Sequence, residues 1–493
     1  MSQEKLKVLF AASEVVGFAK TGGLADVAGA LPKAIKKLGH DIIVVMPRYY
    51  QIDKSQLTKL EAPLGVPMGA MGELWAGVYT TTLAQSEVPV YFIDYERYFG
   101  RSGLYDDHEG SFEDNANRFI FFSKAALQLC KMLHFTPDII HANDWHTAAI
   151  PLLMKTRFVH DFAFAKSVLT IHNLQHQGNF HKNIMDVMEV GWDHYNSHEF
   201  ESMNSVNLLK GGIMHADAVT TVSKKYAQEI QTPEFGFGLQ DHIGAHSDKL
   251  FGILNGVDYD EWNPSVDNLI AKKYDIDDMS GKLECKRDIQ RHFNLEVRDD
   301  VPLIGFVGRF VEQKGIGLIA TVINGLLDMD VQIVMLGAGE KWADGFFGNV
   351  AYHRPNFGLH VGYSDGLAHK IEAGCDMFLM PSLFEPCGLN QIYSLRYGTL
   401  PIVRATGGLD DTIVNFDEHH QHGNGFKFYD AAPEALYYTV LWAVEIYYKD
   451  KAAFKDMQER AMKEHFSWDD SAKSYEAVYQ YILNRHNTPK PIL

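Results

Sequence analysis

The sequence predicts an α/β fold built from two Rossmann-like, doubly wound domains, and three observations support this. The 493 residues exceed what one hydrophobic core usually serves, and a hydrophobic content of 46% is enough to fill two cores. Short apolar runs alternate with segments long enough for a crossover helix. This alternation stops near Asn255 and restarts at Leu303, which predicts two domains of the same class.

The first fifty residues predict one β-α-β unit. Lys7–Ala12 is a short apolar strand, and Ile42–Met46 is another. Between them, apolar residues recur on one face of a helix that Gly39 is placed to end. This unit implies a parallel sheet. Further strands of the first domain are predicted at Asp138–His141, Ser167–Ile171, Ala218–Val222 and Phe251–Leu254.

The second domain follows a polar stretch around Asn263-Pro264. Its predicted strands are Leu303–Val307, Val331–Leu336, Met377–Met380 and Leu400–Val403. Residues Ser467–His486 then show apolar side chains at helical spacing, without heptads long enough for a coiled coil. We expect this helix to pack against a domain of the same chain.

Composition excludes several classes of function. The 45 basic and 63 acidic residues give a formal charge of -18, which would repel nucleic acid and anionic lipid, so we expect neither as a partner. The four cysteines lie far apart and read as reduced thiols. The start, Met1–Lys7, leads into an apolar strand of only a few residues, which is too short for the hydrophobic region of a signal peptide. The expected location is therefore cytoplasmic.

A glycine loop follows the first strand, in the run Lys20-Thr21-Gly22-Gly23-Leu24. Adjacent glycines let backbone N–H groups approach an anion at the positive end of a helix, and Lys20 adds a mobile charge. The alternative is a tight loop whose glycines serve only chain reversal. The position after the first strand favours phosphate or sugar binding.

Charged residues follow two strands of the second domain. Arg309 and Lys314 come after Leu303–Val307, at the carboxyl end where α/β domains bind ligands, and two cations there suit a diphosphate. Glu385 comes after Met377–Met380 and could bind sugar hydroxyls or an oxocarbenium-like centre. The alternatives are solvated surface charges for the two cations and a helix-stabilising role for Glu385.

Polar and aromatic residues also close two strands of the first domain, in the segments His141–His146 and Ile171–Leu174. Imidazole, carboxylate and indole groups at one sheet edge suit sugar hydroxyls and ring faces. Each residue alone is more often packed and hydrogen-bonded than bound to a ligand. Their convergence on one edge favours a sugar site.

Taken in order, these segments resemble the glycogen and starch synthase family. The matching runs are Lys20–Leu24, His141–His146, Leu254–Asp258, Gly308–Gly315, Phe384–Leu389 and Thr406–Leu409, over nearly the whole chain. The resemblance implies two Rossmann-like domains facing a deep cleft, the GT-B architecture. It divides the chain into an acceptor-side domain (1–258), a donor-side domain (259–466) and a C-terminal helix (467–493) that returns to the first domain.

The resemblance also implies an activity: retaining transfer of glucose from ADP-glucose to the 4-hydroxyl of an α-1,4-glucan such as glycogen. The implied catalytic residues are Glu385, Arg309, Lys314 and His172. The implied donor-binding residues are Lys20, Gly22, Gly23, Asp26, Asn255, Tyr363, Cys387, Gly388, Leu389, Thr406, Gly407 and Gly408, with Tyr363 stacking on the base. The implied acceptor-binding residues are Tyr105, Asp144 and Trp145.

No metal or other cofactor is expected, because a nucleoside diphosphate is already a good leaving group and needs mainly charge stabilisation. Asp258-Tyr259-Asp260 and Asp275-Ile276-Asp277 formally match the Asp-x-Asp element of metal-dependent transferases, but their place in the interdomain region favours solvated acids. UDP-glucose is the alternative donor, and a non-catalytic glucan-binding protein is the alternative function. A nicotinamide dehydrogenase is disfavoured because Gly337-Ala338-Gly339 is not followed by the full glycine motif. A pyridoxal-phosphate phosphorylase would need a longer chain and a cofactor lysine.

Overall fold

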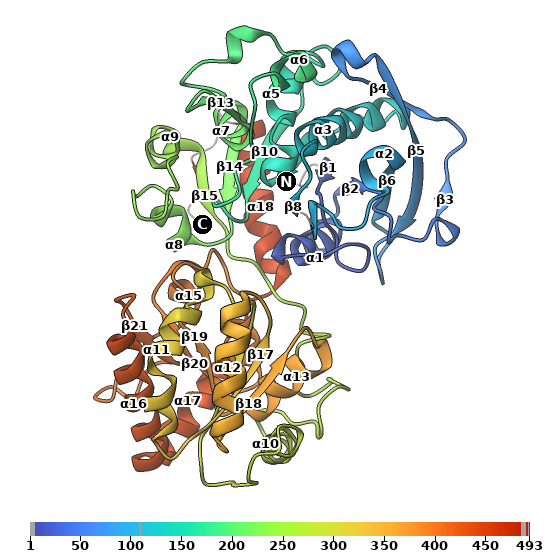
Figure 1. Cartoon of the computed structure of the whole chain (residues 1–493). Coiled ribbons are helices and arrows are strands. Elements are labelled where there is room, and N and C mark those ends of the chain that lie inside the picture. Colours follow the sequence, from blue (N-terminus) through green and yellow to red (C-terminus); the bar gives the residue numbers. More distant parts are fainter. Residues whose placement is uncertain (1–4, 109, 485–489, 492) are drawn as a thin grey trace. The chain divides into compact units, whose positions relative to one another are not determined.

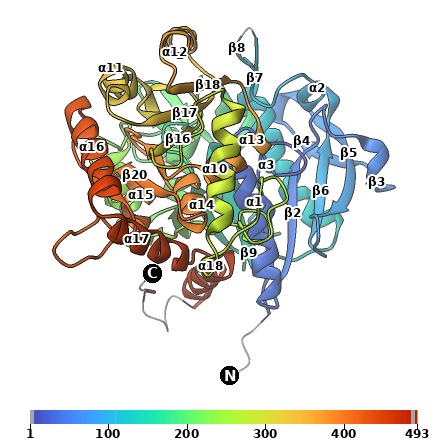
Figure 2. The same cartoon turned by 90° about the horizontal axis from the view of Figure 1, so that it is seen from below.

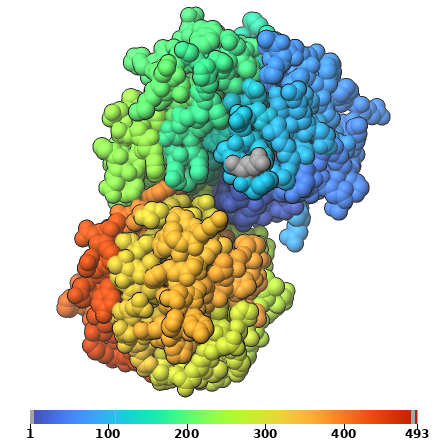
Figure 3. All heavy atoms as spheres, in the orientation of Figure 1, coloured from blue at the N-terminus to red at the C-terminus, as the bar shows by residue number. Residues whose placement is uncertain are grey.

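The structure, a computed structural model, describes residues 5–108, 110–484, 490, 491 and 493. The chain forms two compact units (Figure 1). Among the described residues, those within 1–222, 227–255 and 468–493 form the first unit, and those within 223–226 and 256–467 form the second. Each is an α/β unit with a parallel sheet, as the sequence predicts. In the space-filling view of Figure 3, α12 and α13 of the second unit lie on the side that faces the viewer.

The strands before residue 256 are β1 (Lys7–Ala11), β2 (Asp41–Pro47), β3 (Thr58–Lys59), β4 (Leu64–Pro67), β5 (Glu73–Thr82), β6 (Pro89–Asp94), β7 (Asp106–Asp107), β8 (Gly110–Ser111), β9 (Ile139–Asn143), β10 (Lys166–Ile171), β11 (Asn179–Phe180), β12 (Glu201–Ser202), β13 (Ser205–Asn207), β14 (Ala218–Thr221) and β15 (Leu250–Gly252). The helices of this region are α1 (Gly23–Lys37), α2 (Glu96–Phe99), α3 (Asn115–Met132), α4 (Asp144–Thr147), α5 (Ile150–Lys155), α6 (Ile184–Met188), α7 (Leu208–His215), α8 (Lys224–Glu229) and α9 (Gln240–Ala245).

The main sheet of the first unit has the order β15-β14-β10-β9-β1-β2-β6-β5-β3. Its strands run parallel from β15 to β6, and β5 then pairs antiparallel with β6, β3 and β4. The parallel strands are buried along almost their whole length, which explains why their continuous apolar runs were recognisable. The antiparallel part was not predicted, because β5 alternates between covered and partly exposed residues.

The C-terminal helix α18 (Trp468–Leu483) belongs to the first unit and packs against α1 (Figure 2). Hydrogen bonds join it to the rest of the unit, among them His141 Nδ1 to the Tyr479 hydroxyl at 2.7 Å and His40 Nε2 to Glu476 Oε1 at 2.7 Å. The helical spacing predicted for Ser467–His486 is confirmed as far as Leu483. Residues 485 and 486 lie outside the described part of the chain.

The second unit has a six-stranded sheet in the order β18-β17-β16-β19-β20-β21, with every neighbouring pair parallel. Its strands are β16 (Leu303–Val307), β17 (Gln332–Gly337), β18 (Phe357–Val361), β19 (Met377–Met380), β20 (Leu400–Arg404) and β21 (Phe426–Phe428). Its helices are α10 (Ser280–His292), α11 (Ile316–Leu327), α12 (Lys341–His353), α13 (Asp365–Gly374), α14 (Asn390–Arg396), α15 (Gly407–Thr412), α16 (Pro433–Lys449) and α17 (Lys451–Lys463).

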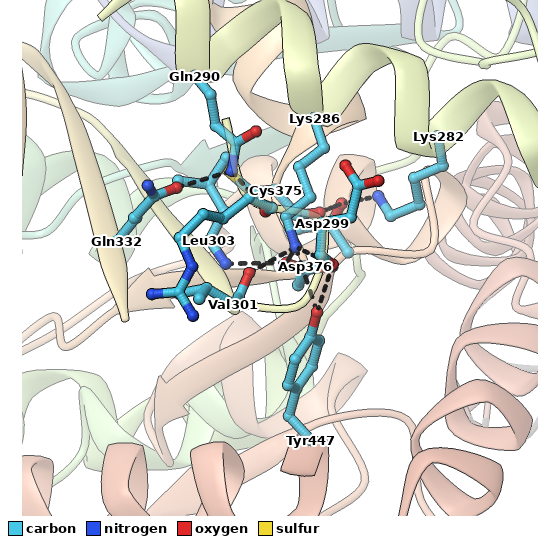
Figure 4. Close-up of polar contacts among 12 residues, drawn as sticks. Lys282, Lys286, Gln290, Asp299, Val301, Leu303, Gln332, Cys375, Asp376 and Tyr447 are labelled. Carbon is cyan, nitrogen blue, oxygen red and sulfur yellow. Dashed lines mark hydrogen bonds and ion pairs between the residues drawn. The ribbon is translucent and has the colours of Figure 1, made fainter. Parts of the chain in front are cut away.

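A buried lysine side chain stabilises the amino-terminal edge of this second sheet (Figure 4). Lys286 on α10 donates to the Val301 carbonyl at 2.6 Å and forms an ion pair with Asp376 at 2.8 Å. Asp376 in turn accepts the Leu303 N–H at 2.8 Å, where β16 begins. These bonds fix the starts of β16 and β19, so the carboxyl ends of the same strands remain for ligand binding.

Candidate functional site

The glycine loop of the first unit is organised by a residue that the sequence analysis did not single out, Glu14. This buried carboxylate accepts the Thr21 N–H at 2.5 Å, the Thr21 hydroxyl at 2.6 Å and the Gly22 N–H at 3.1 Å. It also accepts the Tyr105 hydroxyl at 2.6 Å, and that hydroxyl lies 2.8 Å from the hydroxyl of Ser13. Burial and the Glu14 charge hold the pKa of Tyr105 well above its usual value. Tyr105 therefore stays protonated and keeps donating to Glu14.

Lys20 and Asp26 of the same loop form an ion pair, with Nζ 2.7 Å from Oδ1. Gly22 precedes α1 without a side-chain cap, and a Cβ at Gly22 or Gly23 would meet no atom within 4 Å. Packing therefore does not require glycine at either position. Their open backbone and the helix start are compatible with an approaching anion, as the sequence analysis predicted.

Asp144 and His172 meet at the carboxyl ends of β9 and β10. Asp144 Oδ1 accepts the His172 backbone N–H at 2.7 Å, and burial raises the pKa of this carboxyl to about 7. His172 Nε2 lies 2.9 Å from Asn143 Oδ1, and the Asn143 amide nitrogen donates to the Ala11 carbonyl at 3.0 Å. Since the oxygen of Asn143 therefore faces the ring, His172 carries its proton on Nε2 and presents Nδ1 as an acceptor. Burial lowers the pKa of His172 to about 3, so the ring is neutral.

Tyr105 and Trp145 both lie against His146. The ring centroids of Tyr105 and His146 are 4.6 Å apart, and those of Trp145 and His146 are 4.0 Å apart. Trp145 is only 8% exposed and also contacts Phe119 and Phe180. Its indole therefore serves mainly in packing. The predicted contact of Trp145 with the acceptor glucan stays a prediction, because little of the ring is exposed to make it. Tyr105 is half-buried and acts on the loop through Glu14.

Asn255 ends the main part of the first unit and is 6% exposed. Its side-chain oxygen is buried and accepts no hydrogen bond from the described residues. A buried amide oxygen without a donor costs free energy, so such groups tend to occur where a ligand or water supplies the donor. This supports the predicted role of Asn255 as a contact to a sugar hydroxyl.

In the second unit, Lys314 and Glu385 form an ion pair, with Nζ 2.5 Å from Oε2. The Glu385 side chain is 7% exposed, and the Ser382 hydroxyl donates to the same oxygen at 3.0 Å. Gly315 follows with a φ of +70°, and a Cβ there would lie 2.0 Å from the Pro381 carbonyl oxygen. Only glycine allows this close approach, which brings the loop after β16 against the loop after β19. Arg309 lies earlier on the first of these loops and is exposed.

The predicted donor segments 384–389 and 406–409 also lie in contact. A Cβ at Gly407, whose φ is +45°, would lie 1.9 Å from the Glu385 carbonyl oxygen, and one at Gly408 would lie 1.9 Å from that of Cys387. The Gly408 N–H donates to the carbonyls of Glu385 at 3.1 Å and Pro386 at 3.2 Å. This glycine pair therefore positions the Glu385 loop, and the Gly408 N–H already has protein acceptors.

The other predicted donor residues are placed as follows. Thr406 and Cys387 are buried, Gly388 has a φ of +70°, and Leu389 directly precedes α14. Tyr363 follows β18 and is 86% exposed, with its hydroxyl 3.3 Å from Asp365 Oδ1. An exposed ring at the carboxyl end of a strand is compatible with stacking on a base, which stays a prediction.

The two Asp-x-Asp matches serve as local turn caps. Asp258 Oδ1 accepts the Asp260 N–H at 2.9 Å, and Asp275 Oδ1 accepts the Asp277 N–H at 3.0 Å. Within residues 5–108, 110–484, 490, 491 and 493, groups of His, Asp or Glu able to share an ion occur elsewhere, at His194–Glu199–His215 and at Glu261–Asp365–His369. Neither group includes a predicted catalytic or donor-binding residue.

Cys130, Cys285, Cys375 and Cys387 are all buried, and none of them forms a disulfide within the described residues. Among the described residues, no helix is long and apolar enough to cross a membrane.

Comparison with known proteins matches both units. Residues 7–245 match the family of the starch synthase catalytic domain, and residues 288–462 match glycosyl transferases group 1. The chain is 54% identical over 486 residues to glycogen synthase 1 of Geobacter sulfurreducens, covering 98% of this chain and 97% of that protein. It is 44% identical over 483 residues to glycogen synthase of Anaeromyxobacter sp., covering 97% and 99%.

Solved structures give the same picture. The catalytic domain of starch synthase IV from Arabidopsis thaliana, bound to ADP and acarbose, aligns with a TM-score of 0.90 and 32% identity, covering 98% of this chain and 100% of that one. Sucrose-phosphate synthase from Thermosynechococcus elongatus, at 15% identity and a TM-score of 0.57, shares the fold.

Proposed function

Because the chain belongs to the family of glycogen and starch synthases, we propose that it transfers glucose from ADP-glucose to the non-reducing-end 4-hydroxyl of an α-1,4-glucan, with retention of configuration. The main structural observation in support is the Lys314–Glu385 pair at the carboxyl ends of the second sheet. It places a cation and a carboxylate together where α/β domains bind ligands.

The donor is proposed to lie on the second unit, with its diphosphate at Arg309 and Lys314. Cleavage of the bond between glucose C1 and the β-phosphate oxygen leaves a nucleoside diphosphate that gains negative charge. Fixed cations stabilise that charge as it develops, which lowers the barrier to departure. The reaction therefore needs no metal or other cofactor in this proposal.

The glucose is proposed to lie beside Glu385, whose carboxylate stabilises an oxocarbenium-like C1 and accepts sugar hydroxyls. The glucan 4-hydroxyl attacks C1 from the face that the diphosphate leaves, and the departing phosphate oxygen takes the hydroxyl proton. Retention follows from this same-face attack. Neutral His172 is proposed as a hydrogen-bonding contact to the transferred sugar through Nδ1, since Nε2 is committed to Asn143.

The first unit is proposed to contribute the remaining contacts. Lys20 and the N–H groups of the Gly22-Gly23 loop suit a phosphate, and Asp26 sets the position of Lys20. Asn255 suits a sugar hydroxyl because its buried oxygen accepts no hydrogen bond from the described residues. Tyr105 and Asp144 are proposed to act on the acceptor side. A cytoplasmic location, and the absence of nucleic acid and membrane partners, stay predictions from composition.

ADP-glucose is preferred as donor because a starch synthase of the same fold, 32% identical to this chain, was solved with ADP bound. UDP-glucose is the alternative, and the two are distinguished by assay. Transfer of labelled glucose to glycogen is measured from each donor in parallel. Incorporation from ADP-glucose at a much higher kcat/KM supports the preferred donor, and the reverse ratio would establish the alternative.

The site is tested with Lys314→Ala and Glu385→Ala. A matched control is the exposed pair Lys449–Glu445 on α16, whose charged atoms are 3.1 Å apart. We expect both site variants to lose at least about a hundredfold in kcat, because each removes charge that acts in the transition state. Lys449→Ala and Glu445→Ala should retain full activity.

Folding must be checked in the same experiment. Removing one partner of a buried ion pair costs roughly 3–5 kcal/mol, so thermal unfolding is recorded for every variant and activity is compared at temperatures where each is folded. Folded Glu385→Ala enzyme with unchanged turnover would refute the assigned site. No transfer from either donor by the wild-type chain would favour a non-catalytic glucan-binding protein.

A further inference from the structure

His369 on α13 is a buried histidine with a partner on only one ring nitrogen. The residue is 1% exposed, and Nδ1 lies 2.8 Å from Asp267 Oδ2. Nε2 is also buried, yet it makes no hydrogen bond within the described residues. Leaving a buried polar atom unsatisfied costs about 1–3 kcal/mol, so the position of Nε2 requires an explanation.

The surroundings fix which nitrogen carries the proton. Asp267 also accepts the Tyr397 hydroxyl at 2.5 Å and the Leu269 N–H at 2.8 Å. Both oxygens of Asp267 thus serve as acceptors for neighbouring donors, and His369 Nδ1 donates to Oδ2 in the same way. In the neutral ring, Nε2 then carries a lone pair.

The ring plane is fixed as well. Trp262 stacks on His369 with centroids 3.7 Å apart and planes 15° apart, and on Tyr393 with centroids 3.9 Å apart and planes 5° apart. Two parallel rings this close to one indole must lie on its opposite faces. The imidazole is therefore held in one orientation, and the direction of Nε2 is set in advance.

Two carboxylates lie near Nε2. Asp365, in the first turn of α13, has Oδ2 at 4.0 Å from Nε2. Glu261 lies in the turn before Trp262. One carboxylate oxygen of Glu261, one of Asp365 and a ring nitrogen of His369 all lie within 4.8 Å of one another. Both carboxylates are exposed, so they can move by the small amount that coordination requires. The helix bearing Asp365 and His369 lies on the side viewed in Figure 1.

We propose that Glu261, Asp365 and His369 form a binding site for a divalent transition metal ion, with Zn²⁺ the best fit. A histidine that donates one nitrogen to a carboxylate and offers the other to a metal is a recurring arrangement in zinc sites, and Asp267 supplies that carboxylate here. Zinc accepts imidazole nitrogen and carboxylate oxygen at about 2.0–2.2 Å, with water completing the coordination. The ion would join the turn at Glu261 to the start of α13.

The other group of possible ligands in the first unit differs in one respect. Glu199 Oε2 already lies 2.5 Å from His194 Nδ1 and 2.6 Å from His215 Nε2, so these atoms satisfy one another without an ion. None of these three residues has a buried side-chain atom that lacks a hydrogen bond, so this group has no counterpart to His369 Nε2. This group is nevertheless a competing zinc site, so the experiment must include it.

The test is a calorimetric titration of the full chain with Zn²⁺ after treatment with a chelator. Three variants each remove one ligand: Glu261→Gln, Asp365→Asn and His369→Asn. The asparagine keeps a donor for Asp267 but lacks Nε2. Glu445→Gln on α16 is the control for loss of an exposed carboxylate, and His215→Asn is the control for the competing group. Thermal unfolding with and without Zn²⁺ gives a second readout, because a ligand that binds only the folded chain raises Tm.

We expect one equivalent of Zn²⁺ to bind and to raise Tm, and affinity to fall at least about tenfold in Glu261→Gln and in Asp365→Asn. These two substitutions are on the surface, so they test the site even if His369→Asn does not fold. Glu445→Gln and His215→Asn should bind as the wild type does. The proposal is overturned if the wild-type chain binds no Zn²⁺, if both surface variants keep wild-type affinity, or if binding is lost only in His215→Asn.

Discussion

Glu14 gives a sharp test of how the first unit prepares its glycine loop. Its carboxylate accepts hydrogen bonds from two backbone N–H groups, of Thr21 and Gly22, and from two hydroxyls, of Thr21 and Tyr105. The loop itself is exposed, so few other contacts order it. We predict that Glu14→Ala disorders the loop and thereby lowers kcat/KM for the donor. Glu14 acts as a positioning residue, so it need not touch the substrate.

The size of the effect follows from the bonds lost. A hydrogen bond to a charged group contributes about 1.5–3 kcal/mol, but water can replace Glu14 at the exposed N–H groups of Thr21 and Gly22. The buried Tyr105 hydroxyl still has Ser13 as a partner. We therefore expect Glu14→Ala to lower the free energy of unfolding by about 3 kcal/mol. Because misplacing a binding loop by about 1 Å can cost a hundredfold, kcat/KM for the donor should fall by about that factor.

Glu14→Gln separates the charge from the hydrogen bonds. The amide oxygen can still accept the two N–H groups, and the hydroxyls of Thr21 and Tyr105 can turn and accept from the amide nitrogen. We expect less than about a tenfold loss in kcat/KM. Steady-state kinetics with varied donor, with thermal unfolding alongside, measure both variants. Glu61→Ala, at an exposed position, serves as control. A folded Glu14→Ala enzyme with kcat/KM within about twofold of wild type would refute the reasoning.

Three further predictions concern pH, the Glu385 loop and a glycine of α12. Burial raises the pKa of Asp144 to about 7, so between about pH 4 and pH 7 the folded chain binds more protons at this site than the unfolded chain does. The free energy of unfolding therefore falls as pH rises through this range. Asp144→Asn, which cannot ionise, should flatten that part of the Tm–pH profile. Gly407→Ala should lower both activity and stability, since its Cβ would lie 1.9 Å from the Glu385 carbonyl oxygen at a positive φ. Gly345→Ala, with no atom within 4 Å of its Cβ in the interior of α12, should instead stabilise by about 0.5–1 kcal/mol, as chemical unfolding would show.

The sequence was most informative where a strand is buried on both faces. The run Leu303–Val307 became β16 at those bounds, and Met377–Met380 became β19, because continuous apolar runs of that length have few other stable placements. The same patterns placed Arg309 and Glu385 after strands, at the sheet edge where ligands bind. Function came from the family resemblance, since no single motif distinguishes a sugar site from a packed loop.

What the sequence could not predict depends on contacts between distant residues. Glu14 precedes the glycine loop by a few positions, but its role follows only when Tyr105 is brought to the same carboxylate. His369 and Asp267 are far apart in the chain, and nothing in either segment alone indicates a histidine with one bonded nitrogen. The family resemblance assigned Gly407 to donor binding, whereas its close approach to the Glu385 carbonyl shows that it also serves packing.

Lys314 and Glu385 were predicted as separate groups, one for the diphosphate and one for the sugar, and their ion pair changes how each can work. Glu385 is buried, so turning Lys314 fully toward a phosphate would leave a carboxylate without its counter-charge, at a cost of several kcal/mol. An ammonium has three N–H donors, so Lys314 can bond Glu385 and a phosphate oxygen together. We therefore expect Lys314 to couple the two halves of the donor. Lys314→Ala should then impair glucose positioning as well as diphosphate binding, which lowers kcat more than it raises KM.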